Sequence, residues 1–163
     1  SILGSLIENV TTTSLRELDA AQLDDFMANK ADVFIGNLSR MRIEAQRNGA
    51  IFIAVTQQVK SYSIAPEDIR GITYAEERRM LEEKLQRDGT LNYREAVMLT
   101  HTRLMDALRK WATEENVPLV DGIRALDQRR DTLVSRVHLS PEGNRILAHA
   151  IAEQILAMKC SEN

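Results

Sequence analysis

Cysteine, proline and aromatic residues are scarce in this sequence. Among its 163 residues there are one cysteine and three prolines, and aromatic side chains make up 4%. The single thiol, Cys160, lies in a polar tail, so it indicates neither a disulfide within the chain nor a metal site. No stretch approaches the ~18 uninterrupted apolar residues of a membrane-spanning helix. The sequence therefore predicts no membrane span.

An excess of charge of one sign is also lacking. The formal net charge is −3, with acidic and basic residues mixed along the chain. Two basic pairs, Arg78-Arg79 and Arg129-Arg130, are interrupted by acids and have no interleaved aromatics, so we interpret them as solvated surface and predict no nucleic-acid partner. The histidines are His101, His138 and His149, and they do not have metal-ligand spacing. We therefore predict no metal site and no cofactor, and we expect His101 and His149 on the surface.

Two short apolar runs predict buried strands. The first, Ile51-Phe52-Ile53-Ala54-Val55, is rich in β-branched residues and shows no polar alternation, which is typical of a strand covered on both faces of a parallel sheet. The second is Val117-Pro118-Leu119-Val120, where a proline near the start is tolerated. We predict that residues 51–55 and 117–120 are neighbouring or near-neighbouring parallel strands. The segment 56–71 then leaves the carboxyl end of the first strand, where ligand sites of open α/β sheets lie.

Helical signals surround these strands. Capping boxes at Ser14–Glu17 and Thr73–Glu76 each predict a helix start, and residues 92–115 carry a long amphipathic pattern. An earlier helix, ending at Asn48-Gly49, has an apolar stripe of Phe34, Leu38, Met41 and Ala45. The order of helices and strands predicts an α/β fold that is helix-rich, with parallel strands and flanking helices.

The last helix has the clearest start signal in the chain. Ser140 is a favoured N-cap, Pro141 suits the first helical position, and Glu142 complements the positive helix end. A stripe at helical spacing, predicted to be buried, follows: Leu147, Ile151, Ile155 and Met158. His138 lies just before this helix, a position from which a side chain can act as a general acid or base.

The octet Val137-His138-Leu139-Ser140-Pro141-Glu142-Gly143-Asn144 resembles the last block of the SGNH (GDSL-type) serine hydrolases. The likeness extends in pattern from about Asn37 to Met158. It implies a flavodoxin-like, three-layer SGNH hydrolase fold and an esterase or lipase-like activity on an ester substrate. It also implies that His138 is the catalytic general base.

The residue that would orient His138 departs from the family pattern. The family places an aspartate three residues before the histidine, and this chain has Ser135 there. A main-chain carbonyl near Ser135 can still hold the imidazole, since orientation through Nδ1–H needs only an acceptor. Asp131 and Asp121 are the other candidates, although a strand-end aspartate such as Asp121 is at least as often a helix N-cap.

The nucleophile block of the family is missing. No Gly-Asp-Ser occurs, and the nearest sequence is Gly4-Ser5-Leu6; a degenerate later block over Gly4–Asn9 is the alternative. Ser5 and Asn9 are therefore the candidates for a nucleophile or oxyanion group. We expect residues 1–163 to form a single, incomplete domain, the C-terminal portion of a hydrolase. Its missing strands and nucleophile would come from an upstream N-terminal half or from another chain, because two strands do not make a stable open sheet.

Two other interpretations remain open. The chain can be a catalytically altered relative, in which the missing aspartate and serine reflect changed chemistry. It can also be a helical interaction module, in which the octet is only a well-capped helix start.

Overall fold

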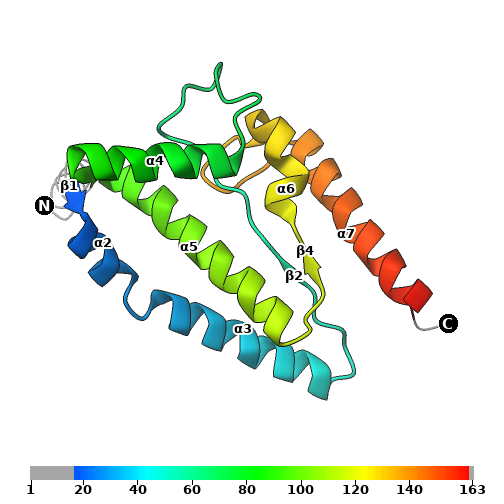
Figure 1. Cartoon of the computed structure of the whole chain (residues 1–163). Helices are drawn as coiled ribbons and strands as arrows, with labels where there is room; N and C mark the ends of the chain where they lie inside the picture. The colour runs from blue at the N-terminus through cyan, green and yellow to red at the C-terminus, as the bar shows by residue number, and fades with distance from the viewer. Residues whose placement is uncertain (1–16, 162–163) are drawn as a thin grey trace, which may run out of the picture.

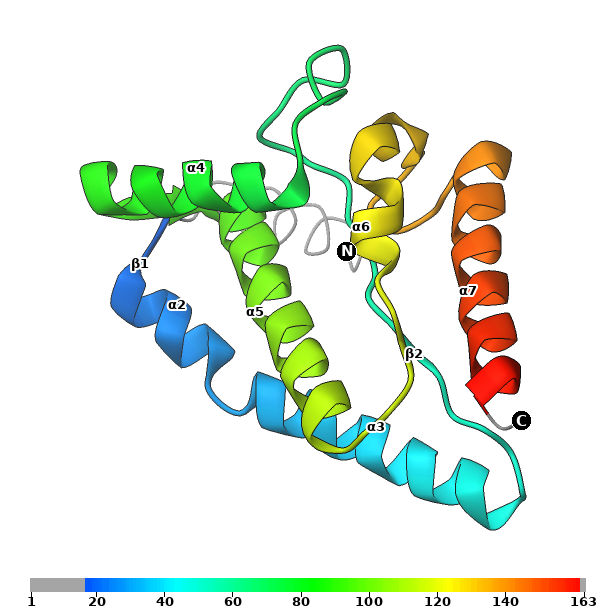
Figure 2. The ribbon, with the colours of Figure 1, turned by 45° about the vertical axis from the view of Figure 1, so that its right-hand side comes forward.

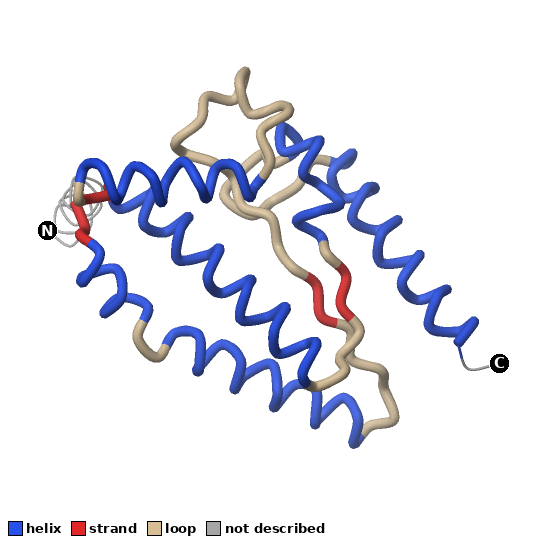
Figure 3. Tube along the Cα trace, viewed as in Figure 1, coloured by secondary structure: helices blue, strands red, loops and turns tan. Residues whose placement is uncertain are grey.

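The structure, a computed structural model, describes residues 17–161 apart from the side chain of Phe26. The helices are α2 (Ala20–Met27), α3 (Lys30–Arg47), α4 (Tyr74–Asp88), α5 (Tyr93–Glu114), α6 (Gly122–Leu126) and α7 (Pro141–Ser161), with a 3₁₀ helix, η1, at Asp127–Thr132. The strands are β1 (Glu17–Asp19), β2 (Ala54–Val55), β3 (Thr90–Asn92) and β4 (Leu119–Val120). Figure 3 shows how small a part the strands make of this helix-rich α/β chain.

The two predicted apolar strands are parallel neighbours. Ala54 pairs with Leu119 and Val55 with Val120. The N–H of Ala54 donates to the Pro118 carbonyl at 2.9 Å, and the N–H of Thr56 donates to the Val120 carbonyl at 3.0 Å. Pairing covers only two residues of each predicted run, and each strand has a single partner among the described residues. The prediction of parallel pairing is confirmed, and the predicted lengths were too long.

The helices lie on both sides of this strand pair. Figures 1 and 2 show α3 and α5 together on one side, with α6 and α7 on the other. The long helix predicted at 92–115 is α5, and its buried residues form the centre of the hydrophobic core. Trp111, 7% exposed, meets Phe52 edge to face with ring centroids 6.2 Å apart. Burying such aromatic pairs joins α5 to the segment that leads into β2.

The start of the chain differs from its prediction. Ser14 lies outside the described residues, and Glu17 belongs to β1 instead of to the first helical turn. The helix begins later, because Asp19 and Gln22 form the capping box of α2. β1 pairs antiparallel with β3, an unpredicted ladder in which Leu18 faces Leu91. Three-residue strands are too short to show an alternating pattern in the sequence.

The other predicted helix signals are confirmed more closely. Thr73 and Glu76 form the capping box of α4, which ends at Asp88 and is followed by its C-cap Gly89 with φ of +79°. α3 ends at Arg47 with Asn48 as its C-cap, and Gly49 follows with φ of +68°, a conformation that glycine adopts without strain. Of its predicted stripe, Met41 is 59% exposed, while the other three residues are half-buried.

The predicted buried stripe of α7 was wrong. Leu147, Ile151 and Met158 are only half-buried, and Ile155 is 40% exposed. α7 packs mainly on α6, η1 and β4, so the described residues leave its apolar side incompletely covered. A complete layer beneath α7 would need more sheet than β2 and β4 provide.

Candidate active site

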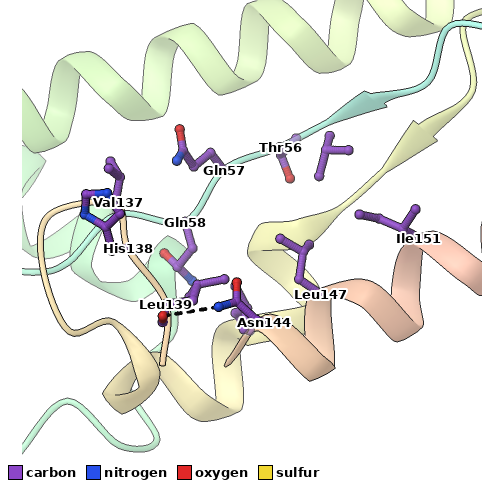
Figure 4. A pocket seen from close by; sticks show the side chains of 11 residues that line it. Thr56, Gln57, Gln58, Val137, His138, Leu139, Asn144, Leu147 and Ile151 are labelled. Carbon is purple, nitrogen blue, oxygen red and sulfur yellow. Dashed lines mark hydrogen bonds between the residues drawn. The ribbon is translucent and has the colours of Figure 1, made fainter. Parts of the chain in front are cut away.

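A cleft of about 460 Å³ lies between the carboxyl end of β2 and the first turns of α7. Its lining is formed by Val55, Thr56, Gln57, Gln58, Leu126, Val137, His138, Leu139, Asn144, Leu147 and Ile151. Figure 4 shows His138 at one end of this cleft, with Leu147 and Ile151 projecting from α7 toward β2 at the other. The volume is in the range of small-molecule sites. The segment predicted as a pocket wall, from Thr56 onward, contributes three of these residues.

His138 is presented by a tight loop between η1 and α7. Leu133 and Leu139 form an antiparallel bridge, and the N–H of Val134 donates to the His138 carbonyl at 2.9 Å. The N–H of Lys60 donates to the Arg136 carbonyl at 3.0 Å. The His138 side chain is exposed, as its position before a helix predicted. Backbone bonds at both ends of the loop thus hold an accessible imidazole beside the cleft.

The helix start that follows is capped as predicted. The N–H of Gly143 donates to Ser140 Oγ at 3.2 Å, and Asn144 Nδ2 donates to the Leu139 carbonyl at 3.3 Å. Glu142 pairs with Arg129 of η1. A Cβ on Gly143 would lie 2.7 Å from Thr132 Oγ1, so the glycine permits α7 to meet η1 closely. The octet therefore serves to join the last helix to the loop that carries His138.

Of the three candidate orienting groups, Ser135 is the one in contact with His138. Ser135 Oγ lies 2.6 Å from His138 Nδ1, and the N–H of His138 approaches the same oxygen at 3.4 Å. Asp131 is engaged by Arg129 and Arg70. The group at Nδ1 is thus the Ser135 hydroxyl and not the main-chain carbonyl that the sequence had led us to expect. Ser5 and Asn9 lie outside the described residues.

Asp121 belongs to the junction between β4 and α6. It accepts hydrogen bonds from Thr56 Oγ1 at 2.7 Å and from the N–H of Arg124 at 3.2 Å, and it pairs with Arg109. Partial burial alone would raise the pKa of Asp121, but the bonds from Thr56 and Arg109 outweigh it, so the pKa lies below its usual value. The aspartate is thus the N-cap of α6, the alternative that its strand-end position had left open.

A buried ionic network lies behind the loop that leaves β2. The side chains of Arg130 and Glu77 are 0% and 1% exposed and form an ion pair, and Ser61 Oγ donates to Glu77 at 2.5 Å. Arg130 also donates to the carbonyls of Ile72 and Thr73. The interpretation of Arg129-Arg130 as solvated surface was wrong for Arg130. Charge runs carry no signal for burial, because an arginine enters a core only when tertiary contacts pair it.

His101 is also more buried than expected. Tyr74 contacts its Nδ1 in a short hydrogen bond between α4 and α5. Burial, together with the charge of Arg136, lowers the pKa of His101 to about 4. Burial also raises the pKa of the Tyr74 hydroxyl, so both side chains are neutral near pH 7. His149 is exposed and lies 3.3 Å from Glu153, as predicted for a surface residue.

In residues 17–161, no group of three or more acidic, histidine or cysteine side chains is arranged to hold a metal ion. None of the described helices is both long and apolar enough to cross a membrane. Comparisons with protein-family models, curated proteins and solved structures find no match to this chain.

Proposed function

We propose that this chain is the C-terminal part of an SGNH-type ester hydrolase in which His138 is the general base. The observation that carries the proposal is the position of His138, exposed at the carboxyl end of a parallel strand pair and held through Nδ1 by the residue three positions earlier. Ligand sites of open parallel sheets lie at that end of the strands. The resemblance of the octet to the family's last block points to the same residue.

The reaction proposed is acyl transfer from an ester to water. A serine hydroxyl attacks the ester carbonyl carbon while His138 Nε2 takes its proton, and the same proton then goes to the leaving alkoxide. Water attacks the acyl-enzyme by the same steps and releases the carboxylic acid. The serine belongs to a segment outside residues 17–161, in an upstream N-terminal half or another chain.

Ser135 determines how well His138 can serve in this role. To act as a base at Nε2, the neutral imidazole must carry its proton on Nδ1. An aspartate can only accept, so it enforces this tautomer, whereas a serine hydroxyl can either accept from Nδ1–H or donate to Nδ1. We infer that Ser135 orients the ring without selecting its tautomer, and without the negative charge that stabilises an imidazolium.

The presence of Ser135 in place of the family's aspartate also supports a second candidate, a catalytically altered relative. A hydroxyl in place of a carboxylate is expected to lower turnover, since exchanging the triad aspartate for a neutral group costs about 10⁴-fold in kcat in the best-studied serine protease. In this alternative the cleft still binds an ester or its product, and hydrolysis is slow.

The test is the removal of His138 from the polypeptide that includes the upstream segment. We expect His138→Ala to lose nearly all turnover of p-nitrophenyl esters, with an unchanged circular dichroism spectrum, because an exposed loop histidine contributes little packing. His149→Ala, which removes an exposed histidine of α7, is the matched control and should keep full activity. Wild-type kcat in the His138→Ala enzyme would reject the proposal.

A further inference from the structure

The cleft beside His138 has a lining without acidic or strongly basic side chains. Charged residues make up 28% of the chain, yet none of the 11 described residues that line the cleft is Asp, Glu, Lys or Arg. A charged ligand would lose its hydration there without gaining an oppositely charged partner, which is costly. As far as residues 17–161 form it, the cleft therefore suits an uncharged ligand.

A buried carboxamide in the wall of the cleft has an acceptor without a donor. Gln58 is 2% exposed and lies between Gln57 and Leu139 in the wall (Figure 4). Its Nε2 donates to the Ile123 carbonyl at 3.4 Å and to Asp127 Oδ1 at 3.3 Å. Because both partners only accept, the amide cannot be turned over, and no donor in residues 17–161 reaches its Oε1. This wall therefore lacks hydrogen-bond donors.

Two exposed amides face the same space near His138. Gln57 lies two residues beyond the end of β2 (Ala54–Val55), and its side chain makes no hydrogen bond within the described residues. Asn144 Nδ2 donates to the Leu139 carbonyl at 3.3 Å, which leaves Oδ1 as an acceptor turned into the cleft, toward the segment after β2 (Figure 4). Ligands of open sheets bind just outside the carboxyl ends of the strands. The two amides are therefore placed to bind a ligand from opposite walls.

We propose that the cleft binds an uncharged ester that carries free hydroxyl groups, and that Gln57 and Asn144 bind those hydroxyls. A hydroxyl both donates and accepts, so it can donate to Asn144 Oδ1 and can form either kind of bond with the Gln57 amide. The apolar part of the ester then lies against Val55, Leu147 and Ile151, which line the other end of the cleft. The identification of the ligand as a substrate rests on the proposed function, whereas the binding itself does not require hydrolysis.

NMR titration of the full chain with two matched esters tests the proposal. Glycerol monobutyrate and n-propyl butyrate share a carbon skeleton and an ester group and differ only in two hydroxyls. We expect the first to bind about tenfold more tightly, the effect of two neutral hydrogen bonds, and to shift the side-chain amide signals of Gln57 and Asn144. An apolar cleft would favour n-propyl butyrate instead. Butyrylcholine, a cation, should bind more weakly than glycerol monobutyrate.

Substitution of Gln57 identifies the group that binds the hydroxyls. Gln57→Met removes the amide at similar size, and it should weaken glycerol monobutyrate about three- to tenfold while leaving n-propyl butyrate unchanged. Gln46→Met, the same change at an exposed position of α3, is the matched control and should alter neither affinity. Gln57→Glu adds a negative charge to the lining and should increase the affinity for butyrylcholine.

Tighter binding of n-propyl butyrate would overturn the proposal, as would the failure of either ester to shift the Gln57 and Asn144 amide signals. Equal affinities in the wild type and Gln57→Met would overturn the role of Gln57. These results are separate from the test of hydrolysis with His138→Ala. Selective binding of glycerol monobutyrate together with unchanged kcat in His138→Ala would support the binding site and reject the hydrolase. Loss of turnover in His138→Ala together with tighter binding of n-propyl butyrate would do the reverse.

Discussion

At the scale of single residues, two histidines occupy opposite environments. His138 is exposed and bonded to a serine hydroxyl, whereas His101 is largely buried and bonded to the Tyr74 hydroxyl. Burial in a low dielectric disfavours the charged imidazolium, which lowers the pKa of His101. His138 therefore bears on the proposed reaction, and His101 bears on the stability of the fold.

Ser135→Asp should change the tautomer of His138. The carboxylate can only accept a hydrogen bond, so it holds the neutral ring's proton on Nδ1 and leaves the Nε2 lone pair free. Imidazole ¹⁵N chemical shifts should report the Nδ1–H form in the variant and a mixture in the wild type. In the polypeptide that includes the upstream segment, kcat should rise by at least tenfold with little change in KM. Ser135→Ala serves as the comparison, and identical ¹⁵N spectra for the wild type and Ser135→Asp would contradict the role of Ser135.

His101 should make stability fall in acid. Its pKa is about 4 in the folded chain and 6.5 in the unfolded chain, so between these values the unfolded state binds more protons. Stability therefore decreases as the pH falls from 6.5 to 4, by up to about 3 kcal/mol from this group. His101→Gln keeps an acceptor for Tyr74 and does not titrate. Its free energy of unfolding, measured with urea, should therefore fall less than that of the wild type between pH 6.5 and 4. Parallel pH profiles for the two proteins would show that His101 titrates normally.

At the scale of elements, close junctions hold the site together. α7 meets η1 at Gly143, and the ion pair of Glu77 with Arg130 ties α4 to η1. Buried ion pairs of this kind are costly to break on one side, by about 3–5 kcal/mol, although they stabilise little against an apolar substitute. The elements around His138 are thus positioned by a few specific contacts instead of by an extensive sheet.

Gly143→Ala should disturb the His138 loop. The added methyl would meet Thr132 Oγ1 at 2.7 Å and Leu139 Cβ at 3.1 Å, so α7 must move away from η1. We expect a loss of about 1–3 kcal/mol in the free energy of unfolding, with altered NMR shifts at His138. Gly36→Ala is the matched control, because nothing lies within 4 Å of its Cβ and the helix α3 should gain about 0.5–1 kcal/mol. Equal effects at the two positions would exclude a role for close packing at Gly143.

At the scale of the whole molecule, the described residues form a helical body around an incomplete sheet. β2 and β4 pair with each other and with no third strand in residues 17–161, and the apolar side of α7 is partly exposed. Two-stranded sheets are marginal without further cover. This incompleteness agrees with the proposal that the catalytic serine lies in a segment outside these residues.

The chain by itself should not hydrolyse simple esters. A general base without its nucleophile provides little more than weak background catalysis, so we expect no p-nitrophenyl acetate turnover above that of a denatured sample. Addition of a serine-directed phosphonate should therefore change nothing. Phosphonate-sensitive turnover by the isolated chain would contradict this prediction, and mass spectrometric labelling at Ser5 would then identify that residue as the nucleophile.

The sequence by itself determined the local structure that depends on near neighbours. The helix starts at Thr73 and Ser140, the glycine stop after Asn48 and the apolar run leading to Val55 are visible because caps and periodicity act over a few residues. Ser135 was identifiable as a candidate through its spacing from His138. Interactions between residues close in the sequence are enough to produce these features.

Only the tertiary structure decided which side chains are buried and which groups meet. It brought Arg130 to Glu77 and Tyr74 to His101, paired β1 with β3, and assigned Asp121 to a helix cap instead of to His138. These contacts join residues far apart in the sequence, and their energies depend on burial and geometry that periodicity does not encode. For the same reason the exposure of α7 could not be foreseen, since an apolar stripe shows that a helix can be covered and not what covers it.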